Sequence, residues 1–232
     1  MTAAEPITTL DAPEVRIARG LAWPDKARWH AWLRFMLVFY LLFFPVYFGT
    51  QYIAPPRPGF ALYFAWESAI PLVPWMIWPY LSLFTLFCVP LVQMTGGEMR
   101  RLTLQSNIPL LVAAVCFLVF PCRSGFPPAE IDGFHRPIFA ALHAVDTTQN
   151  LVPSLHVAFS GLILLGARDV AVRSLRPVYV GWLLVMLCAV VLTHQHHIVD
   201  VPTGLALVVV ARIAFPLAGR SARDRTPGRI GG

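Results

Sequence analysis

Charged residues are scarce in this sequence. Only 13% of its 232 residues are Asp, Glu, Lys or Arg, and 57% are hydrophobic, whereas about 25% of the residues of a soluble domain are charged. Cysteine is also rare, and Cys88, Cys116, Cys122 and Cys188 form no CxxC pair, so neither a disulfide framework nor a zinc site is predicted. Residues 1–29 contain no apolar core followed by a small-residue cleavage site, so no signal peptide is predicted. These scarcities predict an integral membrane protein.

Six apolar runs have about the length of a membrane-spanning helix. They are residues 30–52, 72–94, 107–122, 154–170, 177–194 and 200–217. We therefore predict an all-α, polytopic bundle of six transmembrane helices. The predicted domains are a cytoplasmic segment at 1–29, a membrane domain at 30–217 and a disordered cytoplasmic tail at 218–232, which is rich in Gly and Arg. The Pro- and aromatic-rich stretch 53–71 is predicted to lie at the membrane interface.

The positions of the basic residues predict the orientation of this bundle. If the N-terminus is cytoplasmic, all but three of the 18 Lys and Arg residues fall in inner segments; the exceptions are Arg57, Arg123 and Arg136. The positive-inside rule therefore favours six spans with both termini in the cytoplasm. The net charge of +6 is explained by topology, so nucleic acid is not a predicted partner. We predict a bacterial inner (plasma) membrane protein with its polar loops facing the periplasm or exterior.

Two chain-distant segments place histidine at this outer face. His196 and Asp200 are four residues apart, which puts both on one face of a helix. There the carboxylate accepts the Nδ1–H of the imidazole and leaves Nε2 free as a nucleophile or base. In the stretch LVPSLH, Ser154 is a predicted helix N-cap, and His156 lies in the first turn that follows. Ionisable groups at this depth are candidates for function.

Two outer arginines complete this constellation. Arg123 and Arg136 lie in the loop that leads to His156, and guanidinium groups bind phosphate oxygens through two parallel hydrogen bonds. Two arginines, a helix N-terminus, a His–Asp pair and a second histidine predict a phosphoryl-transfer site that needs no metal or other cofactor. The predicted partners are the bilayer and a lipid phosphate substrate.

The same residues resemble a known family. Residues 153–156, PSLH, resemble the PSxH motif of the type 2 phosphatidic acid phosphatase superfamily, and residues 196–200, HHIVD, resemble the HxxxD end of its last motif. The resemblance covers residues 107–217, the predicted catalytic core. Arg136 and the following Pro match the end of the first motif of the family, KxxxxxxRP.

The sequence departs from the family at two places. Ala129 stands at the lysine of the first motif, and Ala189-Val190 stand where the last motif opens with Ser-Arg. These departures favour the branch that resembles inositol-phosphorylceramide synthase, in which Arg123 would take the basic role.

The resemblance implies a two-step mechanism. His196 would attack phosphorus and form a phosphohistidine, with Asp200 orienting the ring. His156 would protonate the leaving alcohol. Ser154, the first-turn amides and Arg123 or Arg136 would stabilise charge on the phosphoryl oxygens.

Three other interpretations stay open. A phospholipid headgroup transferase would differ from a phosphatase only in the second acceptor. A di-iron enzyme is suggested by the cluster HQHH at residues 194–197, although the chain has only seven histidines. A non-catalytic polytopic lipid-binding homologue would account for the departures from the family motifs. The sequence predicts neither the natural lipid nor the oligomeric state.

Overall fold

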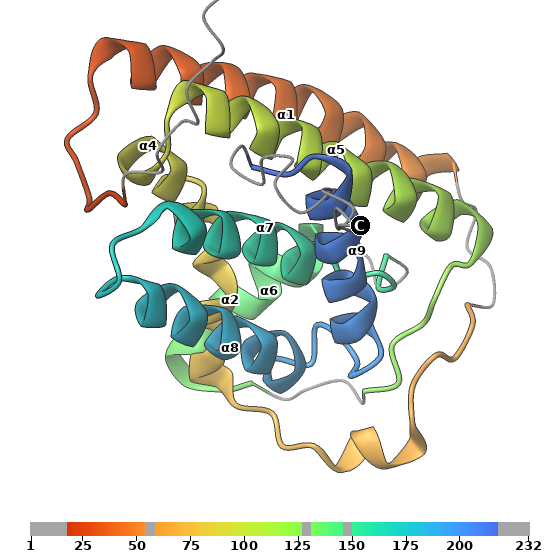
Figure 1. The fold of residues 1–232 in the computed structure, drawn as a ribbon. Coiled ribbons are helices and arrows are strands. Elements are labelled where there is room, and N and C mark those ends of the chain that lie inside the picture. The colour runs from red at the N-terminus through yellow and green to blue at the C-terminus, as the bar shows by residue number, and fades with distance from the viewer. Residues whose placement is uncertain (1–17, 54–58, 127–130, 146–149, 218–232) are drawn as a thin grey trace, which may run out of the picture.

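The computed structural model describes residues 18–53, 59–126, 131–145 and 150–217. These residues form helices and two isolated β-bridges, with no β-strand among them. In Figure 1, α1 (Lys26–Ile53) lies along α5 (Gly96–Val119), and α7 (Leu155–Val170) lies along α8 (Arg176–Leu192). Helix α9 (Asp200–Ala214) packs against α5 and α7. The smaller elements are η1 (Ala65–Ala69), η2 (Pro74–Met76), α2 (Ile77–Leu81), α3 (Leu83–Leu86), α4 (Val89–Gln93), η3 (Gly133–His135) and α6 (Arg136–Val145).

Helix α5 begins well before the predicted run 107–122. Thr95 is its N-cap and forms a capping box with Glu98, in which each side chain bonds the backbone N–H of the other residue. This cap starts the helix at Gly96, roughly three turns before the apolar run, and the added turns include Arg100 and Arg101. The helix ends at Val119, one residue before Phe120 and the following Pro. The predicted boundaries were therefore wrong at both ends.

The predicted run 72–94 is broken into short pieces. Pro74 opens η2, Pro79 lies within α2 and Pro90 lies at the start of α4. Proline lacks a backbone N–H and disfavours helical geometry in the residue before it. The run therefore forms η2, α2, α3 and α4 in succession rather than one straight helix.

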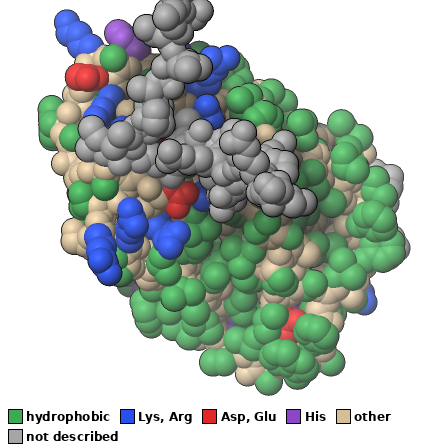
Figure 2. Space-filling model, viewed as in Figure 1, with side chains coloured by type: hydrophobic (Ala, Val, Ile, Leu, Met, Phe, Trp, Pro, Cys, Tyr) green, Lys and Arg blue, Asp and Glu red, His purple; other side chains and the backbone are tan. Residues whose placement is uncertain are grey.

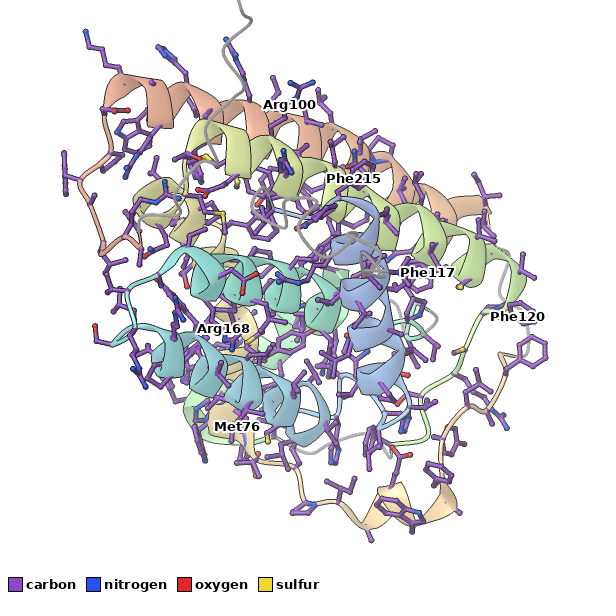
Figure 3. All side chains as sticks on the ribbon, viewed as in Figure 1. Met76, Arg100, Phe117, Phe120, Arg168 and Phe215 are labelled. Atoms are coloured by element: carbon purple, nitrogen blue, oxygen red, sulfur yellow. The ribbon has the colours of Figure 1, made fainter. Side chains whose placement is uncertain are left out.

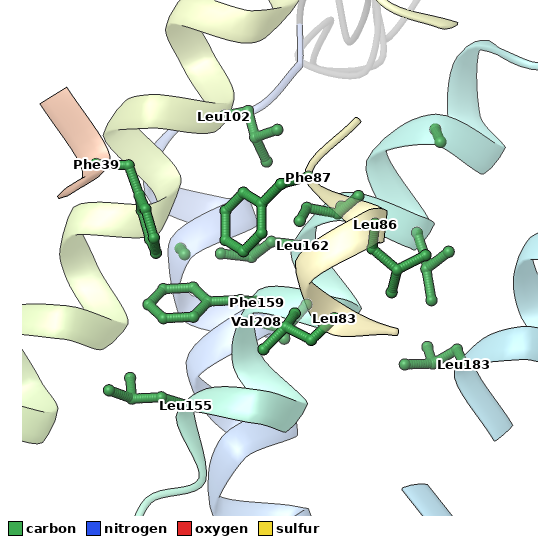
Figure 4. Packing of buried hydrophobic residues seen from close by; sticks show 14 of the residues in the cluster. Phe39, Leu83, Leu86, Phe87, Leu102, Leu155, Phe159, Leu162, Leu183 and Val208 are labelled. Atoms are coloured by element: carbon green, nitrogen blue, oxygen red, sulfur yellow. The ribbon is translucent and has the colours of Figure 1, made fainter. Parts of the chain in front are cut away.

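Helix α7 is the central element of the bundle. Twelve of its 16 residues are buried, because α5, α8 and α9 all pack against it. Figure 4 shows how Phe159 from α7 lies among Phe39 from α1 and Phe87, with Leu162 and Val208 beside them. The candidate site residues at the first turn of α7 are thus held by a well-buried helix.

The two ends of the bundle differ in chemistry. Arg168 lies in the last turn of α7 and Arg212 in the last turn of α9; Figure 3 shows Arg100 and Arg168 on the side away from Phe120. Polar histidine-bearing segments lie at the opposite helix ends, where α7 and α9 begin. Apolar side chains cover most of the remaining surface in Figure 2.

Two described helices are long and apolar enough to cross a membrane. They are Lys26–Gln51, with a mean hydropathy of 1.8, and Gly96–Val119, with 1.9. Arg176–Leu192 is apolar but shorter. The predicted all-helical class is confirmed, and these helices support membrane association. Residues 1–17 and 218–232, which include the predicted tail, lie outside the described residues.

Close packing of α9 on α7 gives a first prediction. A Cβ added at Gly204 would lie 2.8 Å from the backbone oxygen of Ser154 and 2.8 Å from Cβ of Val157, whereas one added at Gly181 in α8 meets nothing within 4 Å. We expect Gly204→Ala to lower the free energy of unfolding by about 1–3 kcal/mol because α9 must shift. Gly181→Ala should raise it by about 0.5–1 kcal/mol, the gain of Ala over Gly in a helix. Thermal unfolding of the purified protein in detergent checks both, and equal shifts would contradict the packing.

Candidate functional site

The predicted His–Asp pair is formed. Nδ1 of His196 lies 3.0 Å from Oδ2 of Asp200, and both side chains are buried. Because an ionised carboxylate only accepts, the imidazole donates its Nδ1–H and leaves the Nε2 lone pair free. The pair does not share a helix face, as the spacing suggested: His196 lies in the turn before α9, and Asp200 is the first residue of the helix.

His156 faces this pair from the first turn of α7. Its ring centroid is 6.0 Å from that of His196. The ring stacks on Tyr80 at 4.0 Å, with the Tyr80 hydroxyl 3.3 Å from Nδ1. Its Nε2 is buried without a hydrogen-bond partner among the described residues. As predicted, Ser154 is the N-cap of α7, where its Oγ accepts the N–H of Val157 at 3.3 Å.

An apolar groove leads to both histidines. It has a volume of about 200 Å³ and is lined by His156, His196 and a row of aromatic side chains from α1. The row comprises Phe39, Tyr40, Phe43, Phe44, Tyr47 and Phe48. Within it, rings four residues apart stack, as in Phe43 on Tyr47 at 5.1 Å. Phe39, Phe87 and Phe159 in Figure 4 belong to its walls. The groove can hold a hydrocarbon chain whose polar end reaches the imidazoles.

His197 is held on all sides. Its Nε2 accepts the backbone N–H of Gly125 at 2.9 Å, so the ring proton is on Nδ1, which donates to Oε2 of Glu67 at 2.8 Å. Tyr63 and Phe126 stack on the ring at 4.7 Å and 4.3 Å. With both nitrogens bonded, His197 is a structural residue rather than a base or nucleophile.

This arrangement also fixes the pair of His196 and Asp200. The backbone N–H of His197 donates to the same Oδ2 of Asp200 that accepts from His196, at 2.9 Å. The N–H of Ile198 donates to Oε2 of Glu67 at 3.0 Å. The segment containing Glu67 and the loop containing Gly125 are therefore both fastened to the turn that carries His196. We call the hydrogen-bonded pair of Glu67 and His197 the brace.

Glu67 is the residue of the candidate site that sequence reasoning missed, because it lies in a stretch interpreted as interfacial. Its side chain is completely buried. Burial raises the pKa of this carboxyl, but hydrogen bonds from the N–H groups of Phe64 and Ile198 and from His197 outweigh that effect, so the pKa lies below its ordinary value of 4.5. A single carboxylate within the apolar stretch FAWESAIP was the available signal, since such a group is buried only when it has partners.

The predicted arginines are not bonded to the histidines. Arg123 and Arg136 are exposed, and neither guanidinium forms a hydrogen bond or ion pair with the described residues. Arg123 is nevertheless held near the brace, because its backbone N–H bonds the oxygen of Phe60 at 3.0 Å and Gly125, two residues on, bonds His197. Arg136 is the first residue of α6.

The structure describes one of the two positions at which the chain departs from the family motifs. Ala189 and Val190 are completely buried in α8, where the oxygen of Val190 accepts the N–H of His196 at 2.9 Å. This position therefore supports the turn that carries His196 through its backbone. Ala129 lies outside the described residues.

The other histidines of the HQHH cluster point to different partners. Nε2 of His194 lies 3.0 Å from the oxygen of Ile70, and the described residues contain no group of three His, Cys, Asp or Glu side chains arranged to hold a metal ion.

Comparison of the chain with protein-family models, with curated proteins and with solved structures found no match.

The brace gives a second prediction. Glu67→Ala leaves the buried imidazole of His197 and the partly buried N–H groups of Phe64 and Ile198 without their acceptor, so we expect it to lower the free energy of unfolding by about 3–5 kcal/mol at neutral pH. Because the folded-state pKa is below the unfolded-state value, this contribution is present above pH 4.5 and is lost as the pH falls through the folded-state pKa. The measurement is the difference in melting temperature between wild type and variant at several pH values.

Asp132→Ala is the matched control for Glu67→Ala, since it also removes a carboxylate, but one that is exposed. Its melting temperature should follow that of the wild type at every pH. A Glu67→Ala difference that did not shrink in acid would contradict the role of the ionised carboxylate.

Proposed function

We propose that the protein is an integral membrane enzyme that transfers the phosphoryl group of a lipid phosphate through a phosphohistidine. The observation that carries this proposal is the pair of imidazoles at the groove: His196 with its Nδ1 on Asp200 and, 6.0 Å away between ring centroids, His156. Phosphoryl transfer needs a nucleophile and a proton donor on opposite sides of phosphorus, each at about 3 Å from its reacting atom. Two rings this close to each other can both contact one phosphoryl group at the groove.

In the first step, the Nε2 lone pair of His196 forms a bond to phosphorus and the bond from phosphorus to the lipid oxygen breaks. Asp200 holds the ring and stabilises the positive charge that it gains. The departing oxygen takes a proton from Nε2 of His156, the atom that lacks a partner in the structure. A phosphate beside His156 favours the imidazolium that makes this donation.

In the second step, the oxygen of a hydroxyl group forms a bond to phosphorus, the bond from phosphorus to Nε2 of His196 breaks, and the hydroxyl proton passes to His156. If the hydroxyl is that of water, the enzyme is a phosphatase; if it belongs to a lipid alcohol, the enzyme is a phosphotransferase. His196 is only 5% exposed, which favours an acceptor that enters through the apolar groove. A labelled lipid phosphate assayed with and without an acceptor alcohol separates the two, and transfer of a whole headgroup would give a different labelled product.

The membrane arrangement is part of the same proposal. Six spans with cytoplasmic termini would place the start of α7 and the turn before α9 on the periplasmic side of a bacterial inner membrane. The separation of arginine-bearing and histidine-bearing helix ends supports this orientation. The outward-facing apolar side chains of α1, including Leu37, Leu41 and Phe44, would contact lipid.

Substitution of the histidines gives a third prediction. His196→Ala should reduce turnover of a lipid phosphate to the background rate, because no other group forms the covalent intermediate. His156→Ala should reduce kcat by about 10²–10⁴-fold, the usual contribution of a general acid. The exposed His30→Ala at the start of α1 should retain wild-type turnover. Release of phosphate from a short-chain phosphatidate by the purified protein is the measurement, and a fully active His196→Ala variant would refute the proposal.

The arginines give a fourth prediction. The loop of Arg123 is fastened through Gly125 to His197, the neighbour of the nucleophile, whereas no such link to Arg136 is found among the described residues. We expect Arg123→Ala to raise KM and lower kcat/KM by about 10-fold or more, the loss of a charge-assisted hydrogen bond to phosphate. Arg136→Ala serves as the matched exposed-arginine variant and should have the smaller effect in the same assay. The reverse order would assign the phosphate to Arg136.

A further inference from the structure

A second cavity, which is lined by polar side chains, lies at the end of the bundle away from the histidines. Its volume is about 300 Å³, and Arg19, Arg168, Arg176, Glu98 and Asp169 line it. Arg168 is in the last turn of α7, whereas Ser154 caps the first turn. A helix of 16 residues is roughly 24 Å long, so the cavity is remote from the candidate catalytic site. In Figure 2, Lys and Arg side chains gather on the side where Figure 1 places the connection from α7 to α8.

The backbone of Arg19 is firmly positioned in this cavity. Its N–H donates to Val170 at 2.9 Å, and its oxygen accepts from Val172 at 2.9 Å and from Nε2 of Gln93 at 2.8 Å. Gln93 is itself held by the hydroxyl of Tyr179, which donates to its Oε1 at 2.9 Å. The guanidinium of Arg19 therefore projects from a rigid point, and its Nε is buried without a hydrogen-bond partner among the described residues.

The carboxylates of the cavity are already engaged. Glu98 accepts from Arg19 through Oε1 and from the N–H of Thr95 through Oε2. Asp169 pairs with Arg212 through Oδ2 and lies 3.5 Å from Arg168 through Oδ1. Neither carboxylate therefore remains as a ligand for a cation.

The arginines, in contrast, keep donors to spare. Arg176 donates from Nε to the oxygen of Ala171 at 3.1 Å, which leaves both of its Nη groups without a described partner. Arg168 has only its long contact with Asp169, and its side chain is 47% exposed. Guanidinium groups converging on one cavity form a site for an oxyanion, which accepts several hydrogen bonds at once.

We propose that this cavity binds a phosphate group, carried by an anionic phospholipid or free in solution. A phosphate offers acceptor oxygens to Arg168, Arg176 and Arg19 together, which a singly charged carboxylate does less well. Basic pockets at helix ends bind phospholipid headgroups in the same way in membrane proteins. This site does not depend on the proposed enzymatic function.

The test uses the full chain purified in neutral detergent. The melting temperature is measured against inorganic phosphate, with chloride at equal ionic strength as the reference, and against phosphatidylglycerol, with phosphatidylcholine as the reference. We expect phosphate or phosphatidylglycerol to raise the melting temperature. In Arg168→Gln and Arg176→Gln, the apparent Kd should rise about tenfold or more, as the loss of a charge-assisted hydrogen bond predicts. His196→Ala should retain the part of the response that Arg168→Gln and Arg176→Gln lose, which separates this cavity from the candidate catalytic site.

Arg173→Gln is the matched control, because Arg173 is an exposed arginine in the connection between α7 and α8. Arg173 does not line the cavity. A response to both ligands supports recognition of the phosphate group itself, and a response to phosphatidylglycerol alone supports the lipid-borne form. No response to either ligand, an unchanged Kd in both cavity variants, or an equal loss in Arg173→Gln would each overturn the proposal.

Discussion

The buried carboxylate of Glu67 accepts hydrogen bonds from three groups, and the candidate site depends on this interaction. Through His197 it joins the stretch after α1, the loop after α5 and the turn before α9, which are far apart in the sequence. A charge buried among aromatic rings is stable only if its partners stay in place. The position of His196 is therefore coupled to residues that do not line the apolar groove, and the backbone N–H of His197 passes this constraint to Asp200.

The fold separates two kinds of polar chemistry by the length of α7. Histidines with free nitrogens gather where α7 and α9 begin, at the end of an aromatic groove. Arginines with free donors gather where α7 ends and α8 begins. The surface between them is covered by apolar side chains of α1, α5 and α8, such as Leu41, Leu111 and Leu184. This arrangement would suit the proposed lipid enzyme, whose headgroup chemistry must lie beside an apolar path for the chain.

Local signals in the sequence predicted local features well. Ser154 caps α7 and His196 bonds Asp200, because caps and pairs four residues apart depend on near neighbours. The boundaries of the apolar runs were less well predicted. Hydropathy does not register the capping box at Thr95 and Glu98, which starts α5 early. Hydropathy also does not detect the prolines that divide residues 72–94 into short helices.

The sequence by itself determined the all-helical class, the scarcity of charge and the identities of the two histidines and the aspartate, since composition and short-range spacing carry that information. Only the tertiary structure decided that Glu67 is buried against His197, that Tyr80 stacks on His156 and that Arg123 belongs to the loop that the brace holds. These contacts join residues more than 70 positions apart. Such pairings follow from how whole helices pack, and no local pattern in the chain encodes them.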